Sequence, residues 1–165
     1  MGAGKSSIGR RLAARLAVDF FDADAEIEAA AGRTIAEIFA DYGEPAFRDC
    51  ERKVISRLLQ EQPPHVLATG GGAFMSAETR QRLREKAVTV WLSAPVDVLF
   101  ARVKRKGDRP LLKTENPRAT LERLLAERES TYALADITIA SEDAPHEVAV
   151  EALMTKLIEN GLWLP

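Results

Sequence analysis

A short glycine-rich stretch at the start of the chain carries residue types that bind polyphosphates. It reads Gly2-Ala3-Gly4-Lys5-Ser6-Ser7 and contains the second half of a phosphate-binding loop, G-x-x-x-x-G-K-[ST]. Glycines let successive backbone N–H groups point at phosphate oxygens, a lysine reaches the β- and γ-phosphates, and a serine hydroxyl can ligate Mg²⁺. The helix expected to follow adds its positive N-terminal end. The stretch therefore predicts a polyphosphate site.

The loop is incomplete at its beginning. Its first glycine would precede Met1, and so would the strand that normally leads into it. We therefore expect the natural start to lie upstream of Met1, with a chain that begins inside the loop as the alternative. A flexible glycine-rich terminus without a ligand is the structural alternative to a phosphate site.

Two further motifs each follow an apolar run. Asp22-Ala23-Asp24 follows Phe20-Phe21, and Gly70-Gly71-Gly72 follows Val66-Leu67-Ala68-Thr69. Two carboxylates at a strand end can face the crevice in which open α/β sheets bind ligands. Three glycines in a row permit close approach by a ligand or by another segment. A plain turn and a structural bend are the alternatives.

Three arginines are candidates for binding anions. Arg48 lies in the first turn of an expected helix, and Arg128 lies on another expected helix. Arg109 belongs to segment 104–116, which is rich in cations and turn residues and is typical of a mobile lid over phosphates. Alternatively, these residues belong to a solvated surface.

Helices and strands must position these motifs, and hydrophobic periodicity predicts that they alternate along the chain. We expect strands near residues 20–21, 66–69, 88–92 and 137–139, and helices near residues 6–18, 25–31, 34–42, 45–60, 77–86, 95–103, 117–132 and 144–157. This alternation predicts an α/β fold with a parallel sheet and helices on both faces.

Composition narrows the class of protein. The 165 residues suffice for one domain with a full core, and the net charge of −2 argues against a broad nucleic-acid surface. A single cysteine, Cys50, excludes an internal disulfide and suits a reducing cytoplasm. No apolar run approaches the roughly 18 residues of a membrane span.

Taken together, the motifs resemble those of the shikimate kinase family. The resemblance is collinear and covers nearly the whole chain. It rests on Gly2-Ala3-Gly4-Lys5-Ser6, Asp22-Ala23-Asp24, Phe47-Arg48, Gly70-Gly71-Gly72, Arg109-Pro110-Leu111-Leu112, and Arg128 followed by Tyr132.

The resemblance implies a fold and a domain organisation. The fold is the three-layer P-loop NTPase type, whose parallel sheet has about five strands in this family; the first strand is missing here. It implies a single kinase domain over residues 1–165, with a substrate-binding helical region at about residues 25–60 and a lid at about residues 104–116.

The resemblance also implies an activity. ATP would phosphorylate the 3-hydroxyl of shikimate, giving shikimate 3-phosphate and ADP in aromatic amino acid biosynthesis. Mg²⁺ would be the cofactor, and the protein would be a cytoplasmic monomer without nucleic-acid or membrane partners.

The implied site has three groups of residues. Those for ATP are Gly2, Ala3, Gly4, Lys5, Ser6, Ser7, Arg102 and Arg109; those for shikimate are Asp24, Arg48, Gly71, Gly72 and Arg128; those for Mg²⁺ are Ser6 and, through water, Asp22. Lys5, Asp24 and Arg109 would be catalytic, with Asp24 orienting or deprotonating the attacking hydroxyl. Arg48 and Arg128 would clamp the shikimate carboxylate. Arg102 and the region around Pro145 would flank the adenine.

Two other functions stay open at the level of the sequence. One is another small-metabolite kinase of the same fold, acting on gluconate or a nucleoside, although the arginine pair and the glycine triplet favour a carboxylated polyol. The other is a non-catalytic kinase-like binding module whose shortened loop no longer holds ATP. The strand before Gly70 ends in glycines and lacks the aspartate common in P-loop proteins, so Mg²⁺ would rely on Ser6 and Asp22.

Overall fold

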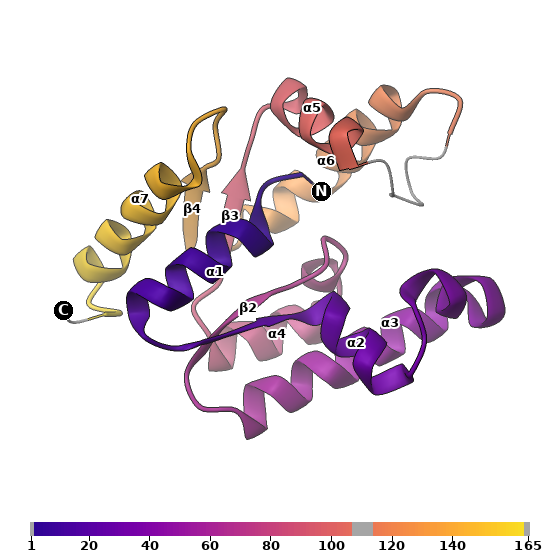
Figure 1. Ribbon diagram of the computed structural model, residues 1–165, viewed down its shortest axis with the longest axis horizontal. Coiled ribbons are helices and arrows are strands. Elements are labelled where there is room, and N and C mark those ends of the chain that lie inside the picture. Colours follow the sequence, from indigo (N-terminus) through magenta and orange to yellow (C-terminus); the bar gives the residue numbers. More distant parts are fainter. Residues whose placement is uncertain (1, 107–113, 164–165) are drawn as a thin grey trace. The chain divides into compact units, whose positions relative to one another are not determined.

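Helices and strands alternate along the chain in the computed structural model, which describes residues 2–106 and 114–163 (Figure 1). The elements are α1 (Lys5–Leu16), β1 (Asp19–Asp22), α2 (Ala23–Ala31), α3 (Ile35–Glu61), β2 (His65–Ala68), the 3-10 helix η1 (Ala73–Met75), α4 (Ala77–Lys86), β3 (Val90–Ser93), α5 (Val96–Lys106), α6 (Pro117–Tyr132), β4 (Ile137–Ala140) and α7 (His146–Glu159). Most bounds lie within two residues of those expected. Most of the expected lid, including Arg109, lies outside the described residues.

β3 and α7 each begin two residues later than the sequence predicted. β3 starts at Val90 and not at Val88, because the N–H group of Thr89 donates to the Asp136 carboxylate at 2.8 Å. α7 starts at His146 and not at Ala144, because Pro145 has extended backbone angles (φ −53°, ψ 142°) that end the preceding loop.

The described chain comprises two compact units, one made of Met1–Ile8 with Val88–Pro165 and the other of Gly9–Ala87. We call them the N/C unit and the middle unit. In the middle unit β1 pairs with β2 in parallel, with Asp22 opposite Ala68. In the N/C unit β3 pairs with β4 in parallel. The predicted parallel pairing is confirmed, and helices make the crossovers that it requires. The prediction of a single domain stays a prediction.

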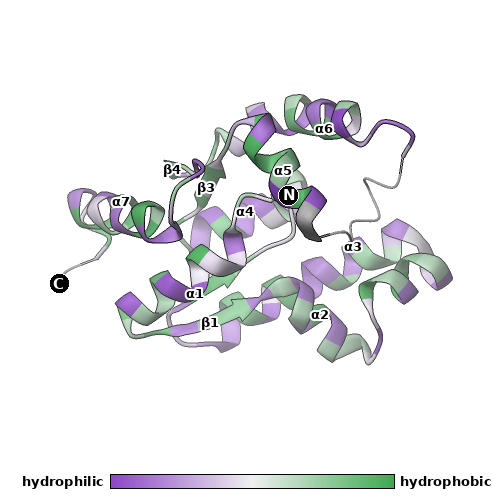
Figure 2. Ribbon diagram, turned by 45° about the horizontal axis from the view of Figure 1, so that its top comes forward, coloured by the Kyte–Doolittle hydropathy of each residue, from purple (hydrophilic) through white to green (hydrophobic). Residues whose placement is uncertain are grey.

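The core of the middle unit forms between α2 and α3. Ile27 of α2 packs with Ile38, Phe47, Val54 and Leu58 of α3. The last three recur at helical spacing, so one stripe of α3 is apolar, and hydrophobic residues alternate with hydrophilic ones along this helix in Figure 2. This packing fixes the rotation of α3 and therefore the direction in which Arg48 leaves it.

Local sequence signals set the ends and the bend of these helices. Asp22 caps α2, and Gly32 ends it in the left-handed conformation (φ 62°). Thr34 and Glu37 form a capping box at the start of α3. Inside α3, Gly43 has φ 78° and ψ 175°, so the helix is two helical segments joined by a kink, which matches the two helices expected there.

Gly43→Ala should destabilise the protein. The backbone angles at Gly43 fall in a region that is open to essentially only glycine, so a side chain there should cost about 1–3 kcal/mol. Urea denaturation of the purified variant measures this cost. Gly32→Asn is the matched control, because asparagine tolerates the left-handed conformation and no atom lies within 4 Å of a Cβ at that position. Equal stability of the two variants would contradict the argument.

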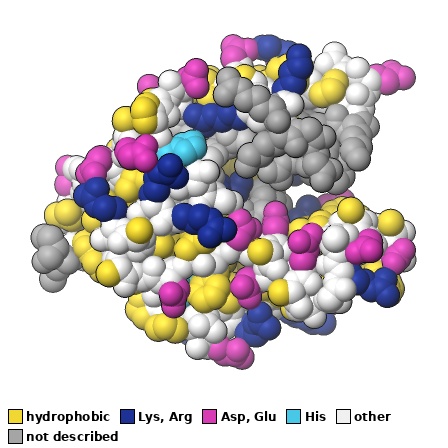
Figure 3. Space-filling model, in the orientation of Figure 1, with side chains coloured by type: hydrophobic (Ala, Val, Ile, Leu, Met, Phe, Trp, Pro, Cys, Tyr) yellow, Lys and Arg dark blue, Asp and Glu magenta, His cyan; other side chains and the backbone are white. Residues whose placement is uncertain are grey.

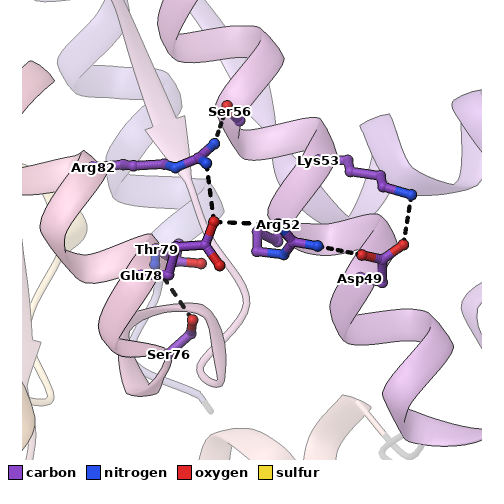
Figure 4. Close-up of polar contacts among 8 residues, drawn as sticks. All are labelled: Asp49, Arg52, Lys53, Ser56, Ser76, Glu78, Thr79 and Arg82. Carbon is purple, nitrogen blue, oxygen red and sulfur yellow. Dashed lines mark hydrogen bonds and ion pairs between the residues drawn. The ribbon is translucent and has the colours of Figure 1, made fainter.

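Ion pairs connect α3 to α4 within the middle unit (Figure 4). Glu78 of α4 accepts from Arg52 of α3 at 3.2 Å and from Arg82 at 2.9 Å. Arg82 also donates to Ser56, and Arg52 to Asp49. These side chains are at least one-third exposed, so each pair contributes little stability. Their role is to fix how α4 lies on α3.

One cluster of buried residues in the N/C unit surrounds the start of the glycine-rich loop. Ala3 packs with Leu99 and Val103 of α5 and with Leu121 of α6. A Cβ on Gly2 would lie 2.9 Å from the carbonyl oxygen of Leu99, and Gly2 has φ 74°. The start of the loop is therefore seated on α5 and requires glycine at this position.

The surface of the protein carries mixed charge. On the face drawn in Figure 3, Lys and Arg side chains are interspersed with Asp and Glu side chains. Among the helices described here, none is both long and apolar enough to cross a bilayer.

Candidate active site

The glycine-rich loop leads directly into α1, whose residues as far as Ile8 belong to the N/C unit. Gly4 has φ 84°, and its carbonyl oxygen accepts the first hydrogen bond of the helix from the N–H of Ile8 at 2.8 Å. Lys5, Ser6 and Ser7 therefore form the first turn of α1, where the helix dipole is positive. This is the arrangement that the sequence predicted for a polyphosphate site.

The carbonyl side of the loop is bound to the segment that follows β4. The hydroxyl of Ser141 donates to the carbonyl oxygen of Ala3 at 2.9 Å. Arg102 of α5 donates to the carbonyl oxygen of Gly2 at 3.4 Å, to the Ser141 hydroxyl at 3.0 Å and to the carbonyl oxygen of Glu142. The structure therefore brings Arg102 against the loop, and its expected role beside the adenine stays a prediction.

A cavity of about 270 Å³ lies beside the same segment of the N/C unit. Its lining includes Ser141, Glu142, Pro145 and His146. The imidazole of His146 packs against the loop, since a Cβ on Gly4 would lie 3.2 Å from its Cε1 atom. The region around Pro145, expected to flank an adenine, thus borders this cavity, and His146 of the same lining also contacts Gly4 of the loop.

The acidic motif of the middle unit lies at the junction of β1 and α2. Asp22 ends the strand, and its carboxylate accepts from the N–H of Asp24 at 3.2 Å. Asp24 lies in the first turn of α2, although the sequence predicted that this helix begins at Ala25. Asp22 therefore caps α2 through its side chain.

Arg48 is held in place by two acidic side chains of its own helix. Its Nη1 donates to Glu51 at 2.8 Å, and its Nη2 and Nε donate to Glu44 at 2.9 and 3.2 Å. Burial alone would lower the pKa of Arg48, but the bonds from Glu51 and Glu44 raise it above its ordinary value. Arg48 is a fixed cation at every accessible pH.

The backbone of the glycine triplet lies close to three charged side chains of the middle unit. A Cβ on Gly72 would lie 2.4–2.6 Å from the guanidinium atoms of Arg48, so the guanidinium rests directly on the backbone of the triplet. A Cβ on Gly70 would lie 2.7 Å from Oε1 of Glu51 and 3.3 Å from Oδ1 of Asp24. The predicted residues Asp24, Arg48 and the triplet are therefore brought together.

Sequence reasoning missed Glu51. It is 3% exposed, and its Oε1 atom has no hydrogen-bond partner among the residues that the structure describes. Burial raises the pKa of Glu51; Arg48 opposes this effect, while Asp24 and Glu44 add to it. The signal in the sequence was its position: Glu51 stands between Phe47 and Val54 on the apolar stripe of α3.

Glu51→Gln should change how stability depends on pH. Because the folded protein raises the pKa of Glu51 above 4.5, the native state binds this proton more tightly than the unfolded chain does. The contribution of Glu51 to stability is therefore greatest below that pKa and is lost as the pH rises through the raised value. Glutamine does not titrate, so the free energy of unfolding of the variant, relative to the unmodified protein, should increase between about pH 4 and about pH 7.

Denaturant titrations over this pH range measure the difference. The control is Glu61→Gln at the exposed end of α3, which should show no such trend. A difference for Glu51→Gln that stays constant with pH would contradict the assignment.

Two predicted site residues remain, Arg128 and Arg109. Arg128 lies on α6 of the N/C unit and is partly buried. Arg109 lies outside the described residues. Their roles stay predictions.

The comparisons with known proteins agree on one family. The family model described as shikimate kinase matches residues 1–159. A shikimate kinase of Rhodopseudomonas palustris is 60% identical over 157 residues, which cover 95% of this chain and 77% of that protein. One of Caulobacter vibrioides is 59% identical, with 95% and 78% covered.

Solved structures of related proteins lead to the same family. The structure of shikimate kinase from Acinetobacter baumannii in complex with shikimate superposes with a TM-score of 0.91 and 37% identity, covering 99% of this chain and 91% of that one. A gluconokinase structure from Sinorhizobium meliloti has a TM-score of 0.58 at 20% identity, which shows a common fold alone. The expected α/β P-loop kinase fold is confirmed. The chain belongs to the shikimate kinase family, and it is therefore a kinase.

Proposed function

We propose that the protein transfers the γ-phosphoryl group of ATP to the 3-hydroxyl of shikimate, giving shikimate 3-phosphate and ADP. The observation that carries this proposal is the cluster of Asp24, Arg48 and Glu51 against the glycine triplet, in a chain 60% identical to a shikimate kinase. The structure of the Acinetobacter relative with shikimate supports the choice of acceptor. The reaction is a step of aromatic amino acid biosynthesis.

Arg48 is suited to bind the carboxylate of the acceptor. A guanidinium has five N–H donors, and Glu44 and Glu51 take three of the five on Arg48. One donor is left on each terminal nitrogen, which is the geometry that a carboxylate binds in a bidentate manner. Glu44 is 55% exposed and can yield its place to a carboxylate of the same charge. Arg128 would supply a second cation.

Asp24 is suited to handle the hydroxyl groups. Its carboxylate lies next to Gly70, which has no side chain. A ligand can therefore approach the carboxylate along the backbone of the triplet. Backbone N–H groups of Gly71 and Gly72 would bind the acceptor beside it. Phosphoryl transfer needs an attacking oxygen that is correctly oriented and able to lose its proton, and a carboxylate in hydrogen-bond reach does both.

The glycine-rich loop is suited to the triphosphate. The N–H groups of residues 2–7 and the positive end of α1 favour an anion, and Lys5 would neutralise charge on the transferred group. Arg109 would add a cation from the lid, and Arg102 would flank the adenine.

The available donors also fit Mg²⁺. Ser6 offers a hydroxyl and Asp22 a carboxylate, and Mg²⁺ is commonly held by one or two such oxygens together with phosphates and water. No cluster of three or more His, Cys, Asp or Glu side chains that could hold a metal occurs among the described residues, so a site built mainly by the protein has no support there. When bound, Mg²⁺ would neutralise the β- and γ-phosphates.

We propose that the enzyme acts as a monomer in the cytoplasm.

A coupled assay of ADP release with a panel of acceptors tests the function. We expect turnover with shikimate and none above background with gluconate or a nucleoside. Turnover with gluconate alone would identify another metabolite kinase. Calorimetry with ATP and Mg²⁺ separates both enzymes from a non-catalytic binding module with a degenerate loop, which would bind no nucleotide.

A further inference from the structure

A buried hydroxyl connects the glycine-rich loop to the end of β4 within the N/C unit. Ser141 is 3% exposed and immediately follows the strand. Its N–H donates to the carbonyl oxygen of Ser93 at 2.6 Å, which continues the ladder with β3 and fixes its backbone. Its hydroxyl donates to the carbonyl oxygen of Ala3 at 2.9 Å and accepts from Arg102 at 3.0 Å.

These bonds fix the directions of two consecutive peptide groups of the loop. A trans peptide is planar, so its C=O and the following N–H point in opposite directions. Ser141 binds the carbonyl of Ala3, which sets the direction of the N–H of Gly4. Arg102 binds the carbonyl of Gly2, which sets the direction of the N–H of Ala3. A polyphosphate needs these N–H groups to converge on one side of the loop.

Glycine gives the loop too much freedom to keep this shape by itself. Gly2 and Gly4 both have positive φ angles, and a glycine adopts many other conformations at little cost. The hydroxyl of Ser141 has one hydrogen, which the Ala3 carbonyl takes, while Arg102 occupies the acceptor side. Both the donor and the acceptor of this hydroxyl are therefore used to hold the loop.

We propose that Ser141 is a positioning residue for nucleotide binding. It orients the backbone N–H groups of the glycine-rich loop through Ala3, and it holds Arg102 in the orientation that binds Gly2. This proposal rests on the proposed binding of ATP by the loop.

Ser141→Ala should weaken nucleotide binding selectively. The loss of one buried hydrogen bond, with the Ala3 carbonyl left without this donor, should raise KM for ATP about tenfold. KM for shikimate should stay within about twofold, because the bonds lost lie only in the loop and its support. Ser141→Thr keeps the hydroxyl and should restore KM for ATP. Ser141→Cys, whose thiol is a weaker donor, should lie in between.

The matched control removes a different buried hydroxyl from the same unit. Thr89 is 8% exposed, and its hydroxyl donates to the Asp136 carboxylate at 2.6 Å. Thr89→Val should lower Tm at least as much as Ser141→Ala does, yet leave KM for ATP unchanged. This comparison separates loop positioning from general loss of stability.

Calorimetry with ADP gives a readout that does not depend on shikimate turnover. We expect the Kd for ADP to rise in Ser141→Ala and to recover in Ser141→Thr. The proposal is overturned if Ser141→Ala leaves KM for ATP and the Kd for ADP unchanged, if Thr89→Val raises them equally, or if the unmodified chain binds no nucleotide. ADP binding without shikimate turnover would overturn the proposed function alone.

Discussion

Asp24→Asn should lower kcat with shikimate by about 10²–10⁴-fold, the range expected for loss of a general base. The amide has almost the shape of the carboxylate but neither its charge nor its basicity, so it can accept a hydrogen bond from a hydroxyl without drawing off the proton. Asp24 lies in the first turn of α2 and is not one of the residues expected to bind ATP, so nucleotide binding should be preserved.

Two measurements check this result. The coupled assay gives kcat, and calorimetry gives the Kd for ADP. Asp19→Asn is the control, because Asp19 is an exposed residue at the other end of β1 and should behave like the unmodified protein. Near-normal turnover by Asp24→Asn would show that Asp24 only positions the substrate.

Arg48→Met should have two separate effects. The loss of a paired guanidinium should weaken shikimate binding by about 2–5 kcal/mol. It also leaves Glu51 buried without its cation, which should lower the free energy of unfolding by about 2–3 kcal/mol. This cost is below that of a fully enclosed pair, because the Arg48 side chain is 32% exposed.

The double variant Arg48→Met with Glu51→Gln separates the two effects. Removing the charge of Glu51 should recover most of the lost stability, and shikimate binding should stay weak. KM for shikimate and urea denaturation are the measurements. Arg57→Met is the control on the same helix, since Arg57 makes an exposed ion pair with Glu26 at 3.3 Å that should contribute little. A double variant no more stable than the single one would contradict the role given to Glu51.

Much of the fold was predictable because strong local signals agree with the tertiary structure. The helix from Pro117 to Tyr132 occurs as expected, and the helix expected from about residue 34 begins with a capping box. A proline in the first turn and a Thr–Glu pair act within a few residues, so such signals can be recognised in the sequence. The exact start of β3 was not predictable. It depends on Asp136, which lies 47 residues away in the sequence.

The motifs of the site were predictable from the sequence, whereas the residues that hold these motifs in place were not. Asp24, Arg48 and the glycine triplet stand out by type, and family resemblance gave them roles. Glu51 and Ser141 did not stand out, because a glutamate on a helix and a serine after a strand are ordinary surface residues until packing buries them. The burial of these two side chains depends on contacts with residues far away in the sequence, and such contacts cannot be read from a single sequence.

Arg48 also has a consequence for the thermodynamics of recognition. A free arginine side chain loses about 2 kcal/mol of rotamer entropy when it is fixed. Glu44, Glu51 and the bare backbone of Gly72 already restrain this one, so the loss occurs during folding and not when a ligand arrives. An incoming carboxylate that takes the two remaining donors binds a cation whose orientation is already fixed. Selectivity for an acid over a neutral polyol then comes from a rigid receptor, and it should survive at temperatures that loosen adaptable binding sites.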